Sequence, residues 1–308
     1  MIFVLGSINA DLVARVAHLP REGETQPASA YAVHAGGKGA NQALAARRAG
    51  ADATMVGAVG RDGFADTALA TLREAGVDTS HVATLDVPTG LALIHVDDRG
   101  RNTITVVPGA NGRVRAAMLD ACPLDVSSVV LLQLEVPLAE VVAAVHRARS
   151  RGARVVLNVA PPAPLPGDML DGVDVLVANE HEAAVVADAA GLPRDPAAFC
   201  AAAADRWHLL AVVTLGASGV VAADAAYAWH VDAARVAVVD TTAAGDGFVG
   251  AFAAALERGA PLVEALAEGA AAGSYACTTQ GAQPSLAPRE RWVALAQALA
   301  SRASTSPR

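Results

Sequence analysis

The second half of the chain alternates between short apolar runs and longer segments whose apolar residues recur with helical spacing. Short runs rich in valine and leucine are typical of strands that are buried on both faces. The pattern predicts strands at 129–134, 154–157, 173–177 and 210–215, and helices at 138–149, 180–190 and 197–206. Because strands connected through helices run parallel in one sheet, we expect an α/β fold with a doubly wound, mostly parallel sheet flanked by helices.

The same two patterns occur at both ends of the chain. They predict strands at 2–5 and 54–59, and helices at 64–75, 262–278 and 289–300. The polar tail 301–308 is expected to be frayed. A chain of 308 residues can bury a large core, so we expect residues 1–308 to form a single α/β domain.

Two stretches interrupt the alternation. The β-rich runs 91–96 and 104–107 are joined by DDRGRN, which is typical of a hairpin loop with a glycine. The prolines and the glycine within 12–34 exclude a long helix there. We expect insertions at about 12–34 and 91–107 to form a small β-sheet lid, which would exclude water from a transfer reaction.

Composition narrows the possible partners and the compartment. The formal charge is −8, and no Lys/Arg cluster is denser than Arg47-Arg48, which argues against nucleic acid and an anionic membrane as partners. The three cysteines are far apart in the sequence and odd in number, which indicates free thiols in a reducing compartment. The N-terminus carries no basic leader before Asp11. We therefore expect a cytoplasmic protein.

The stretch DTTAAGDGFVG, from Asp240 to Gly250, passes from a loop of small residues into a helix. The first N–H groups of a helix have no partner inside it, and its dipole leaves partial positive charge there, so an anion can bind. Asp246 lies where the anion would arrive, and its carboxylate could accept a proton from a nucleophile that attacks a phosphate. The competing interpretation, an Asp that caps an ordinary buried helix, is the commoner one for an isolated Gly-Asp.

Polar residues also lie near the ends of predicted strands. Asn9 and Asp11 follow the first strand, and Glu135 ends 129–134. In an open parallel sheet, ligands lie beyond the carboxyl ends of the strands. These side chains can therefore meet a ligand, although Asn and Asp after a strand are also common in turns.

The stretch GGKGAN, from Gly36 to Asn41, opens a helix that ends near Gly50. Its glycines allow a ligand to approach the backbone, and Lys38 and Asn41 offer donors to hydroxyls or phosphate. Gly39 stands where a P-loop has Ser or Thr, and no GxGxxG follows the first strand. A P-loop enzyme and a Rossmann dehydrogenase are therefore poorly supported.

Two further stretches each allow two interpretations. In NEHE, Asn179 and Glu182 lie three residues apart at a helix start, where they could orient a hydrated metal or simply form an acid-rich N-terminus. In TLGASG, from Thr214 to Gly219, a strand leads into a turn of small residues. That turn could hold a nucleotide phosphate or merely connect two strands.

Several of these stretches, in this order, resemble the ribokinase-type (PfkB) family of carbohydrate kinases. They are GSINAD near the N-terminus, GGKGANQA from Gly36, QLE ending at Glu135, NEHE from Asn179, TLGASG from Thr214, DTTAAGDGFVG from Asp240 and GAQPS from Gly281. The resemblance covers essentially the whole chain. It implies an ATP-dependent kinase that phosphorylates the 5-hydroxyl of D-ribose. The alternatives are a kinase of another sugar or a nucleoside, and a noncatalytic sugar-binding protein on the same fold.

The resemblance also implies a role for each matching residue. Asp246 would be the general base, and the backbone at Ala243, Ala244 and Gly245 would hold the transferring phosphate. The sugar contacts would be Asn9, Asp11, Gly37, Lys38, Asn41 and Glu135. Magnesium and nucleotide contacts would fall on Asn179, Glu182, Thr214 and Gly216. A potassium ion would lie among Asp240, Thr242, Ala276, Thr279, Gly281 and Ser285. The cofactors would be ATP, Mg²⁺ and K⁺, and the lid would carry the contact of a homodimer.

The chain departs from the family pattern just after the expected base. The family often reads DTFNG where this chain has Asp246, Gly247, Phe248, Val249 and Gly250. Because Gly247 and Val249 follow Asp246 and do not replace it, the departure concerns positioning at the site and not the class of reaction.

Overall fold

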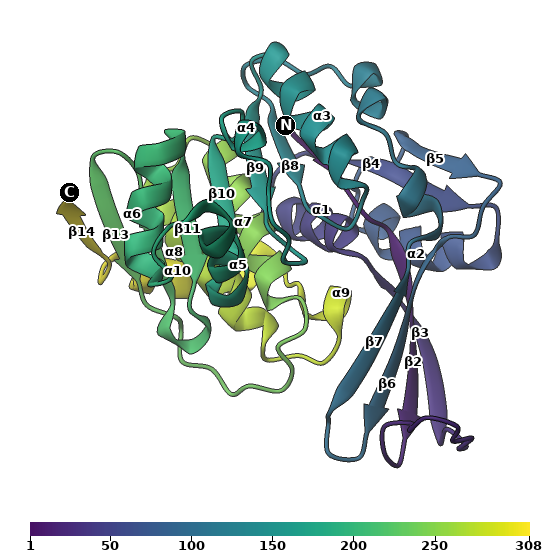
Figure 1. Ribbon diagram of the computed structural model, residues 1–308. Coiled ribbons are helices and arrows are strands. Elements are labelled where there is room, and N and C mark those ends of the chain that lie inside the picture. The colour runs from purple at the N-terminus through teal and green to yellow at the C-terminus, as the bar shows by residue number, and fades with distance from the viewer.

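The computed structural model describes residues 1–308 and contains a large sheet with a smaller sheet projecting from it (Figure 1). The large sheet consists of β1 Ile2–Leu5, β4 Ala53–Gly60, β5 Val82–Leu85, β8 Val129–Leu132, β9 Arg154–Asn158, β10 Val175–Asn179, β11 Leu210–Thr214, β12 Val220–Ala223, β13 Tyr227–Val231 and β14 Ser304–Pro307. Their order is β14-β13-β12-β11-β10-β9-β8-β1-β4-β5. All neighbours from β11 to β5 pair in parallel, and β12, β13 and β14 extend the sheet antiparallel.

Helices cover both faces of this sheet. One layer contains α1 Lys38–Arg48, α2 Gly63–Glu74, α7 Ala244–Glu257, α8 Leu262–Ala276 and α10 Val293–Ala300, and the other contains α3 Leu138–Ser150, α5 Glu180–Ala190 and α6 Pro196–Trp207. The first strand shows why two layers form, because Ile2 and Val4 pack into one core and Phe3 and Leu5 into the other. The predicted doubly wound α/β class is confirmed.

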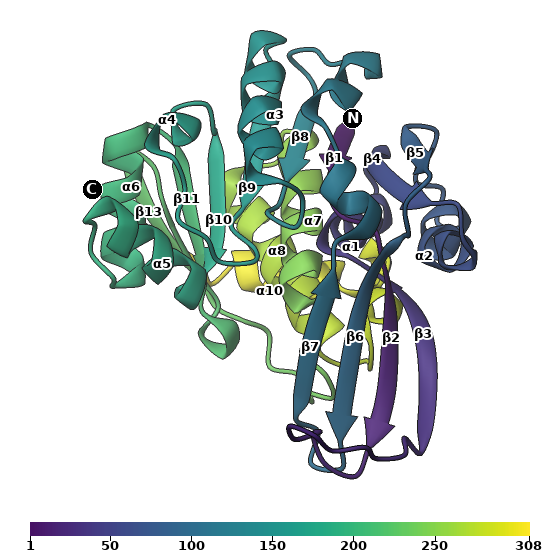
Figure 2. The ribbon, with the colours of Figure 1, turned by 45° about the vertical axis from the view of Figure 1, so that its right-hand side comes forward.

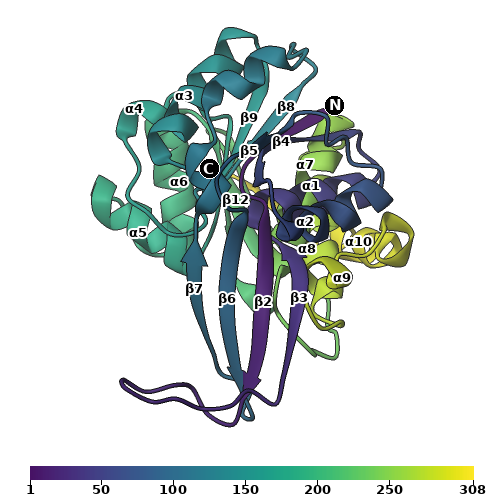
Figure 3. The same cartoon turned by 90° about the vertical axis from the view of Figure 1, so that its right-hand side faces the viewer.

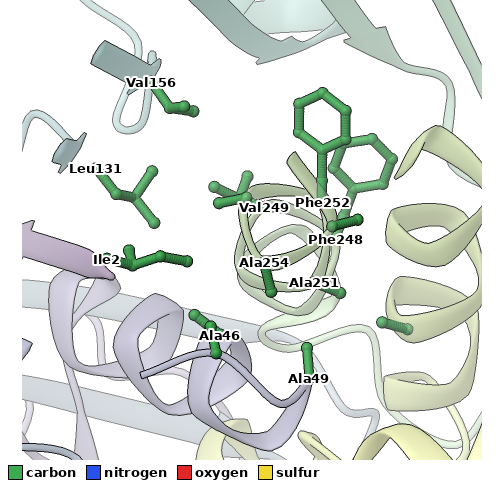
Figure 4. Packing of buried hydrophobic residues seen from close by; sticks show 14 of the residues in the cluster. Ile2, Ala46, Ala49, Leu131, Val156, Phe248, Val249, Ala251, Phe252 and Ala254 are labelled. Carbon is green, nitrogen blue, oxygen red and sulfur yellow. The ribbon is translucent and has the colours of Figure 1, made fainter. Parts of the chain in front are cut away.

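Helix α7 is the central helix of its layer. Its Val249 faces Leu131 and Val156 of the sheet, and its Phe248 and Phe252 rings stack with centroids 5.7 Å apart (Figure 4). Small residues bring the neighbouring helices close to it, since a Cβ atom at Gly250 would overlap Ala45 of α1. The N-terminus of α7 is thereby held in a fixed position against α1 and α8.

The smaller sheet has four strands, and it projects beyond the carboxyl end of β1 (Figures 2 and 3). Its strands are β2 Asn9–Val16, β3 Ala30–Gly36, β6 Gly90–Asp97 and β7 Asn102–Val107, in the order β3-β2-β6-β7. The β6–β7 turn is held by Asp97, whose Oδ1 accepts hydrogen bonds from the backbone N–H groups of Arg99 and Arg101 at 3.0 and 2.9 Å. The predicted small second sheet is therefore present, and Asn9 and Asp11 are part of its β2 and not of a turn.

The C-terminal tail corrects one sequence-based expectation. Residues 304–307 form β14, which pairs with β13, so the tail is not frayed. The Arg308 guanidinium donates from Nη2 to the Ala201 carbonyl at 2.9 Å and to Asp205 Oδ2 at 2.8 Å. An exposed edge strand needs no apolar face, which explains why its polar sequence resembles a disordered end.

Smaller differences concern the boundaries of elements. The predicted helix 289–300 is a 3₁₀ turn, Arg289–Arg291, followed by α10. The sequence patterns also did not reveal α4 Gly167–Leu170, α9 Ala282–Ser285, or strands β5, β12 and β13. No helix in the structure combines the length and the apolar character that crossing a membrane requires.

Candidate active site

The candidate site lies at the carboxyl edge of the parallel strands. Asn9 follows β1, Glu135 follows β8, and Asn158, Asn179 and Thr214 are the last residues of β9, β10 and β11. Parallel strands all end at one edge of their sheet, so distant parts of the sequence meet there. The smaller sheet continues from this edge, and the N-terminus of α7 faces it.

Asp246 is the most constrained carboxylate of the site. Its residue is only 7% exposed, its Oδ2 accepts a hydrogen bond from Nδ2 of Asn41, and its Oδ1 accepts one from Nε2 of Gln42, both at 2.9 Å. Burial raises the pKa of Asp246, while Lys38 and the two amide donors oppose that increase. Asp246 is therefore a buried carboxylate whose two oxygens point in fixed directions, as a positioned proton acceptor requires.

The backbone before Asp246 presents unpaired donors. Ala243, which precedes α7, has φ 60°, a left-handed conformation that costs a residue with a Cβ atom about 1–2 kcal/mol. The N–H of Ala244 donates to the Thr241 carbonyl at 3.2 Å, whereas the N–H groups of Gly245 and Asp246 have no protein partner. These two N–H groups at a helix N-terminus can receive an anion. Of the expected phosphate-holding residues, Gly245 offers a free donor and Ala244 does not.

Glu135 and Lys38 are two further charged residues of the site. Glu135 Oε2 accepts hydrogen bonds from the Ser7 hydroxyl at 2.5 Å and from the backbone N–H of Lys38 at 3.0 Å. Burial alone would lower the pKa of Lys38, but attraction to Asp246, Glu135 and Glu182 outweighs it and raises that pKa. The Lys38 ammonium group therefore stays protonated, although it is largely buried among carboxylates.

Asp11 and Asn9 extend the site onto β2. Desolvation, followed by repulsion from Glu135 and Asp246, raises the pKa of Asp11 to about 7. A Cβ atom at Gly36, on the neighbouring β3, would overlap the Asp11 carboxylate, so this glycine leaves room for the carboxylate in its present position. Asn9 Oδ1 accepts a hydrogen bond from Nδ2 of Asn111 at 2.7 Å, which leaves the Asn9 amide group as a donor.

A pocket of about 500 Å³ lies on the opposite side of the α7 N-terminus. Ala244, Gly245 and Phe248 of α7 form one wall, and α8 forms another. The remaining lining includes Thr214, Gly216 and Ala217 at the end of β11 and Arg235 in the loop after β13. Its size and mostly apolar lining are typical of a site for a small organic molecule. A ligand there would reach the free N–H group of Gly245.

Comparisons with known proteins identify the family. The model of the pfkB family of carbohydrate kinases matches residues 1–289. The chain belongs to this family. It is 35% identical to a ribokinase of Haemophilus influenzae over 295 residues, which are 93% of this chain and 95% of that protein.

Solved structures agree with this family assignment. A crystal structure of ribokinase from Thermotoga maritima has a TM-score of 0.87 and 33% identity, and the match covers 96% of this chain and 99% of that one. A structure of Arabidopsis thaliana ribokinase with ribose and ATP has a TM-score of 0.85 and 31% identity, and the match covers 96% of this chain and 98% of that one. The pfkB family fold therefore extends over nearly the whole chain.

In this pfkB family chain, Asn179 and Glu182 form a reciprocal helix cap. Asn179 Oδ1 accepts a hydrogen bond from the backbone N–H of Glu182, and Glu182 Oε2 accepts one from the backbone N–H of Asn179, both at 2.8 Å. Glu182 is nevertheless only 7% exposed, and burial raises its pKa. The second oxygen of Glu182 has no hydrogen bond, so the residue can both cap the helix and face a ligand.

Hydrogen bonds join several of the residues expected around potassium. Asp240 accepts hydrogen bonds from the Thr242 hydroxyl at 2.7 Å and from the backbone N–H of Gly281 at 2.8 Å. Ala276 and Thr279 lie in the turn that ends α8, where the Ala276 carbonyl accepts from the Thr279 N–H at 3.3 Å. Ser285 is buried, and its hydroxyl donates to the Ala282 carbonyl within its own turn at 2.7 Å.

The sequence pattern did not reveal every residue that this pfkB family site uses. Gln42, Gln133 and Asn158 form a buried amide cluster behind Asp246, Asn111 holds Asn9, and Ser7 donates to Glu135. Gln42 lies in GGKGANQA and Gln133 lies in QLE, two stretches that resemble the family, but the sequence predicted no role for either glutamine. Gly247 packs against Leu286 and Val249 lies in the core, so the two departures after Asp246 serve helix packing.

Proposed function

We propose that this pfkB family kinase transfers the γ-phosphoryl group of ATP to the 5-hydroxyl of D-ribose, giving ribose 5-phosphate and ADP. The observation that carries the proposal is the buried Asp246 beside the free N–H groups at the start of α7, with polar residues on one side and the large pocket on the other. A proton acceptor, an anion-binding helix end and two adjoining ligand sites are the parts that phosphoryl transfer needs.

In the proposed reaction, Asp246 accepts the proton of the sugar hydroxyl. The hydroxyl oxygen then forms a bond to the γ-phosphorus, and the bond from that phosphorus to the β–γ bridging oxygen breaks as ADP leaves. The free N–H groups of Gly245 and Asp246 stabilise the negative charge of the transferring group. Ala243 supports this arrangement because its left-handed conformation turns the chain into α7.

The sugar is proposed to bind between β2 and α1. Asp11 and Glu135 would accept hydrogen bonds from its hydroxyls, and Lys38 and the Asn9 amide would donate to its oxygens. Asn41 Oδ1 is buried without a hydrogen bond, which supports a hydroxyl donor from the sugar at that position. Gly37, with φ 90°, would allow the ring to approach the backbone.

The nucleotide is proposed to occupy the 500 Å³ pocket, with Thr214 and Gly216 beside it. Mg²⁺ fits the uncommitted oxygen of Glu182 and the nearby Asn179, since this ion prefers oxygen ligands and is held largely by nucleotide phosphates and water. When bound, it would neutralise phosphate charge. Lys38 would add a fixed positive charge between the two substrates.

A potassium ion is proposed near the start of α7. Asp240, Thr242 and Gly281 support this site because they are joined by hydrogen bonds beside the loop that leads to Ala243. Ala276, Thr279 and Ser285 would contribute oxygen atoms from the following turns. A titration with KCl against NaCl at constant ionic strength tests the site: selective stimulation by K⁺ supports it, and equal rates with both salts contradict it.

The four-stranded sheet is proposed to act as a lid and as a homodimer contact. Ile104 is 55% exposed and Val106 is 49% exposed. Strand register puts both on the face that carries Asp11, because Asp11 pairs with Ala92, and Ala92 pairs with Val106. A second copy that covers these side chains would also shield the sugar site. The three free cysteines support placement in a reducing compartment, the cytoplasm.

A substrate panel tests the proposed specificity. ADP formation is measured with ribose, deoxyribose, fructose and nucleosides, and the values of kcat/KM are compared. The proposal predicts the highest kcat/KM for D-ribose. A higher value for a nucleoside or another sugar would reject ribose as the substrate, and sugar binding without ADP formation would favour the noncatalytic alternative.

A further inference from the structure

The side chain of Gln42 connects Asp246 to the interior of the large sheet. Gln42 has no exposed surface. Its Nε2 donates to Asp246 Oδ1 and to Asn158 Oδ1, both at 2.9 Å, and its Oε1 accepts from Nε2 of Gln133 at 2.7 Å. Both hydrogens and the carbonyl oxygen of this amide are therefore engaged, by partners on α7, on β9 and in the segment after β8.

These amides can adopt only one orientation. Asn158 Nδ2 donates to the backbone carbonyl of Val177 at 3.1 Å, and a carbonyl cannot donate in return. Asn158 must therefore present its oxygen to Gln42, and Gln42 must present its Nε2 group to Asn158 and Asp246. Gln133 completes the arrangement by donating to the only remaining polar atom of Gln42. Asp246 Oδ1 thus faces a donor that cannot turn away.

A fixed donor matters because Asp246 lies among charges of both signs. The charged groups that face it are Lys38 on α1, Glu135 after β8, Glu182 on α5 and Asp11 on β2. Burial and the three carboxylates favour the protonated form of Asp246, whereas Lys38 and the amide donors favour the ionised form. A protonated Asp246 could not accept the proton of a sugar hydroxyl.

We propose that Gln42 is a positioning residue that keeps Asp246 ionised and fixes the direction of its carboxylate, with Gln133 and Asn158 holding Gln42 in place. The proposal rests on the proposed function of Asp246 as the base. It extends that function, because it attributes the ionised state and the orientation of the base to a buried amide that lies behind Asp246.

The test replaces Gln42 with methionine, which has nearly the same length but cannot donate a hydrogen bond to a carboxylate. The pKa of Asp246 is measured by ¹³C NMR of labelled aspartate carboxyl groups in the absence of substrate, with Asp246→Asn identifying the resonance. We expect Gln42→Met to raise this pKa by about one unit, the size expected for one lost hydrogen bond to a charged group. The apparent pKa on the acidic side of the kcat–pH profile should rise by the same amount. At pH values below this pKa, kcat of the variant should therefore be about tenfold lower than that of the wild type, while its KM for ATP should stay within about threefold of the wild-type value.

Two further variants make the result decisive. Gln133→Met removes only the donor to Gln42, so it should move the pKa in the same direction by a smaller amount, and it provides the test if Gln42→Met does not fold. Thr54→Val removes a buried hydroxyl of β4 that has no contact with Asp246, and it should leave the pKa and the pH profile unchanged. Thermal unfolding establishes that each variant is folded.

An unchanged Asp246 pKa in the folded Gln42 and Gln133 variants, with kcat lowered equally at every pH, would overturn the proposal. The NMR titration needs no substrate, so it is independent of the proposed function. Failure of the wild type to phosphorylate any sugar would reject that function, whereas the titration alone would still decide the role of Gln42.

Discussion

The side-chain amide of Asn41 donates to Oδ2 of Asp246 at 2.9 Å, although 205 residues separate the two in the chain. Asn41 lies in the first turn of α1, and Asp246 lies in the first turn of α7. Two helices from opposite ends of the sequence thus direct their N-termini at one point. The expected proton acceptor is oriented by the helix that also carries the expected sugar contacts.

Replacement of Asp246 should abolish turnover while leaving the fold intact. Asp246→Ala should lower kcat at least about 100-fold, the scale of a positioned general base. The matched control is Asp66→Ala, which changes an exposed carboxylate of α2 and should not alter kcat. Steady-state ADP formation is the measurement, and more than a tenth of wild-type kcat in Asp246→Ala would exclude its role as the base.

Ribose binding should depend on the ionisation of Asp11. Its pKa is about 7, with Glu135 and Asp246 as the facing carboxylates, and the ionised form accepts hydrogen bonds at both oxygens. The ionised fraction rises about tenfold between pH 6 and pH 8, so the KM for ribose should fall by about that factor. The KM of Asp11→Asn should be higher and nearly constant with pH; the same pH dependence in this variant would assign the effect to another group.

Asp11 should also lower stability in the absence of sugar. Its pKa is about 7 when folded and about 3.8 when unfolded, so the folded protein holds the extra proton between these values. The free energy of unfolding therefore falls as pH rises from about 4 to about 7. Asp11→Asn should raise the Tm at pH 8 and change it less at pH 5. A Tm that is lower than wild type at pH 8 would contradict this sign.

Filling the large pocket should impair ATP binding selectively. Ala217 is exposed at the pocket wall, so Ala217→Trp adds volume there without disturbing the core. We expect the KM for ATP to rise at least about tenfold and the KM for ribose to change little. Ala225→Trp, at an exposed position outside the pocket, is the control. Equal effects of the two variants would argue against a nucleotide in this pocket.

The exposed apolar face of β7 should hold two copies together. Ile104→Lys places a charge on the face that carries Asp11, whereas Thr103→Lys places one on the opposite face of the same strand. Light scattering should give a dimer for the wild type and Thr103→Lys and a smaller particle for Ile104→Lys. A monomeric wild type, or identical masses for the two variants, would reject the proposed contact.

A buried ion cluster should stabilise the helical layer around α7. Glu268 is 6% exposed and bonds Arg258 Nη2 at 2.8 Å and Arg289 Nη2 at 2.5 Å. Glu268→Ala should lower the free energy of unfolding by about 2 kcal/mol, less than the value for a fully buried pair because both arginines are partly exposed.

The pH dependence of the Glu268→Ala effect tests whether the stabilisation by this cluster is ionic. Burial raises the pKa of Glu268, but hydrogen bonds from both arginines outweigh it and hold that pKa below the ordinary 4.5. The stabilisation is therefore present above about pH 4.5 and is lost as pH falls through the folded-state pKa. Urea unfolding at pH 7 and pH 3.5 should show a larger effect of Glu268→Ala at pH 7; equal effects would contradict the ionic origin.

The sequence was most informative where local patterns repeat. The alternation from 129 to 215 predicted the parallel sheet because each buried strand and each helix has its own periodicity. The helix start at Asp246 was also predictable, since small residues precede an apolar repeat. β14 was missed because an exposed edge strand has no apolar pattern, and Arg308 is held by distant groups.

Contacts between side chains from different strands could not be predicted from patterns. Gln42 and Asn158 meet only because β9 ends, and α1 begins, at the same edge of the sheet. The raised pKa of Asp11 likewise depends on burial and on two carboxylates from other elements. The roles assigned to individual site residues stay predictions until the variants above are measured.

The proposed reaction is tested most directly by ³¹P NMR of the purified protein with ATP, Mg²⁺, K⁺ and D-ribose. We expect the ATP resonances to convert to those of ADP and of a phosphomonoester identified as ribose 5-phosphate, with no conversion when ribose is omitted or Asp246 is replaced. Unchanged ATP in the complete mixture, or a phosphorylated product other than ribose 5-phosphate, would contradict the proposed reaction.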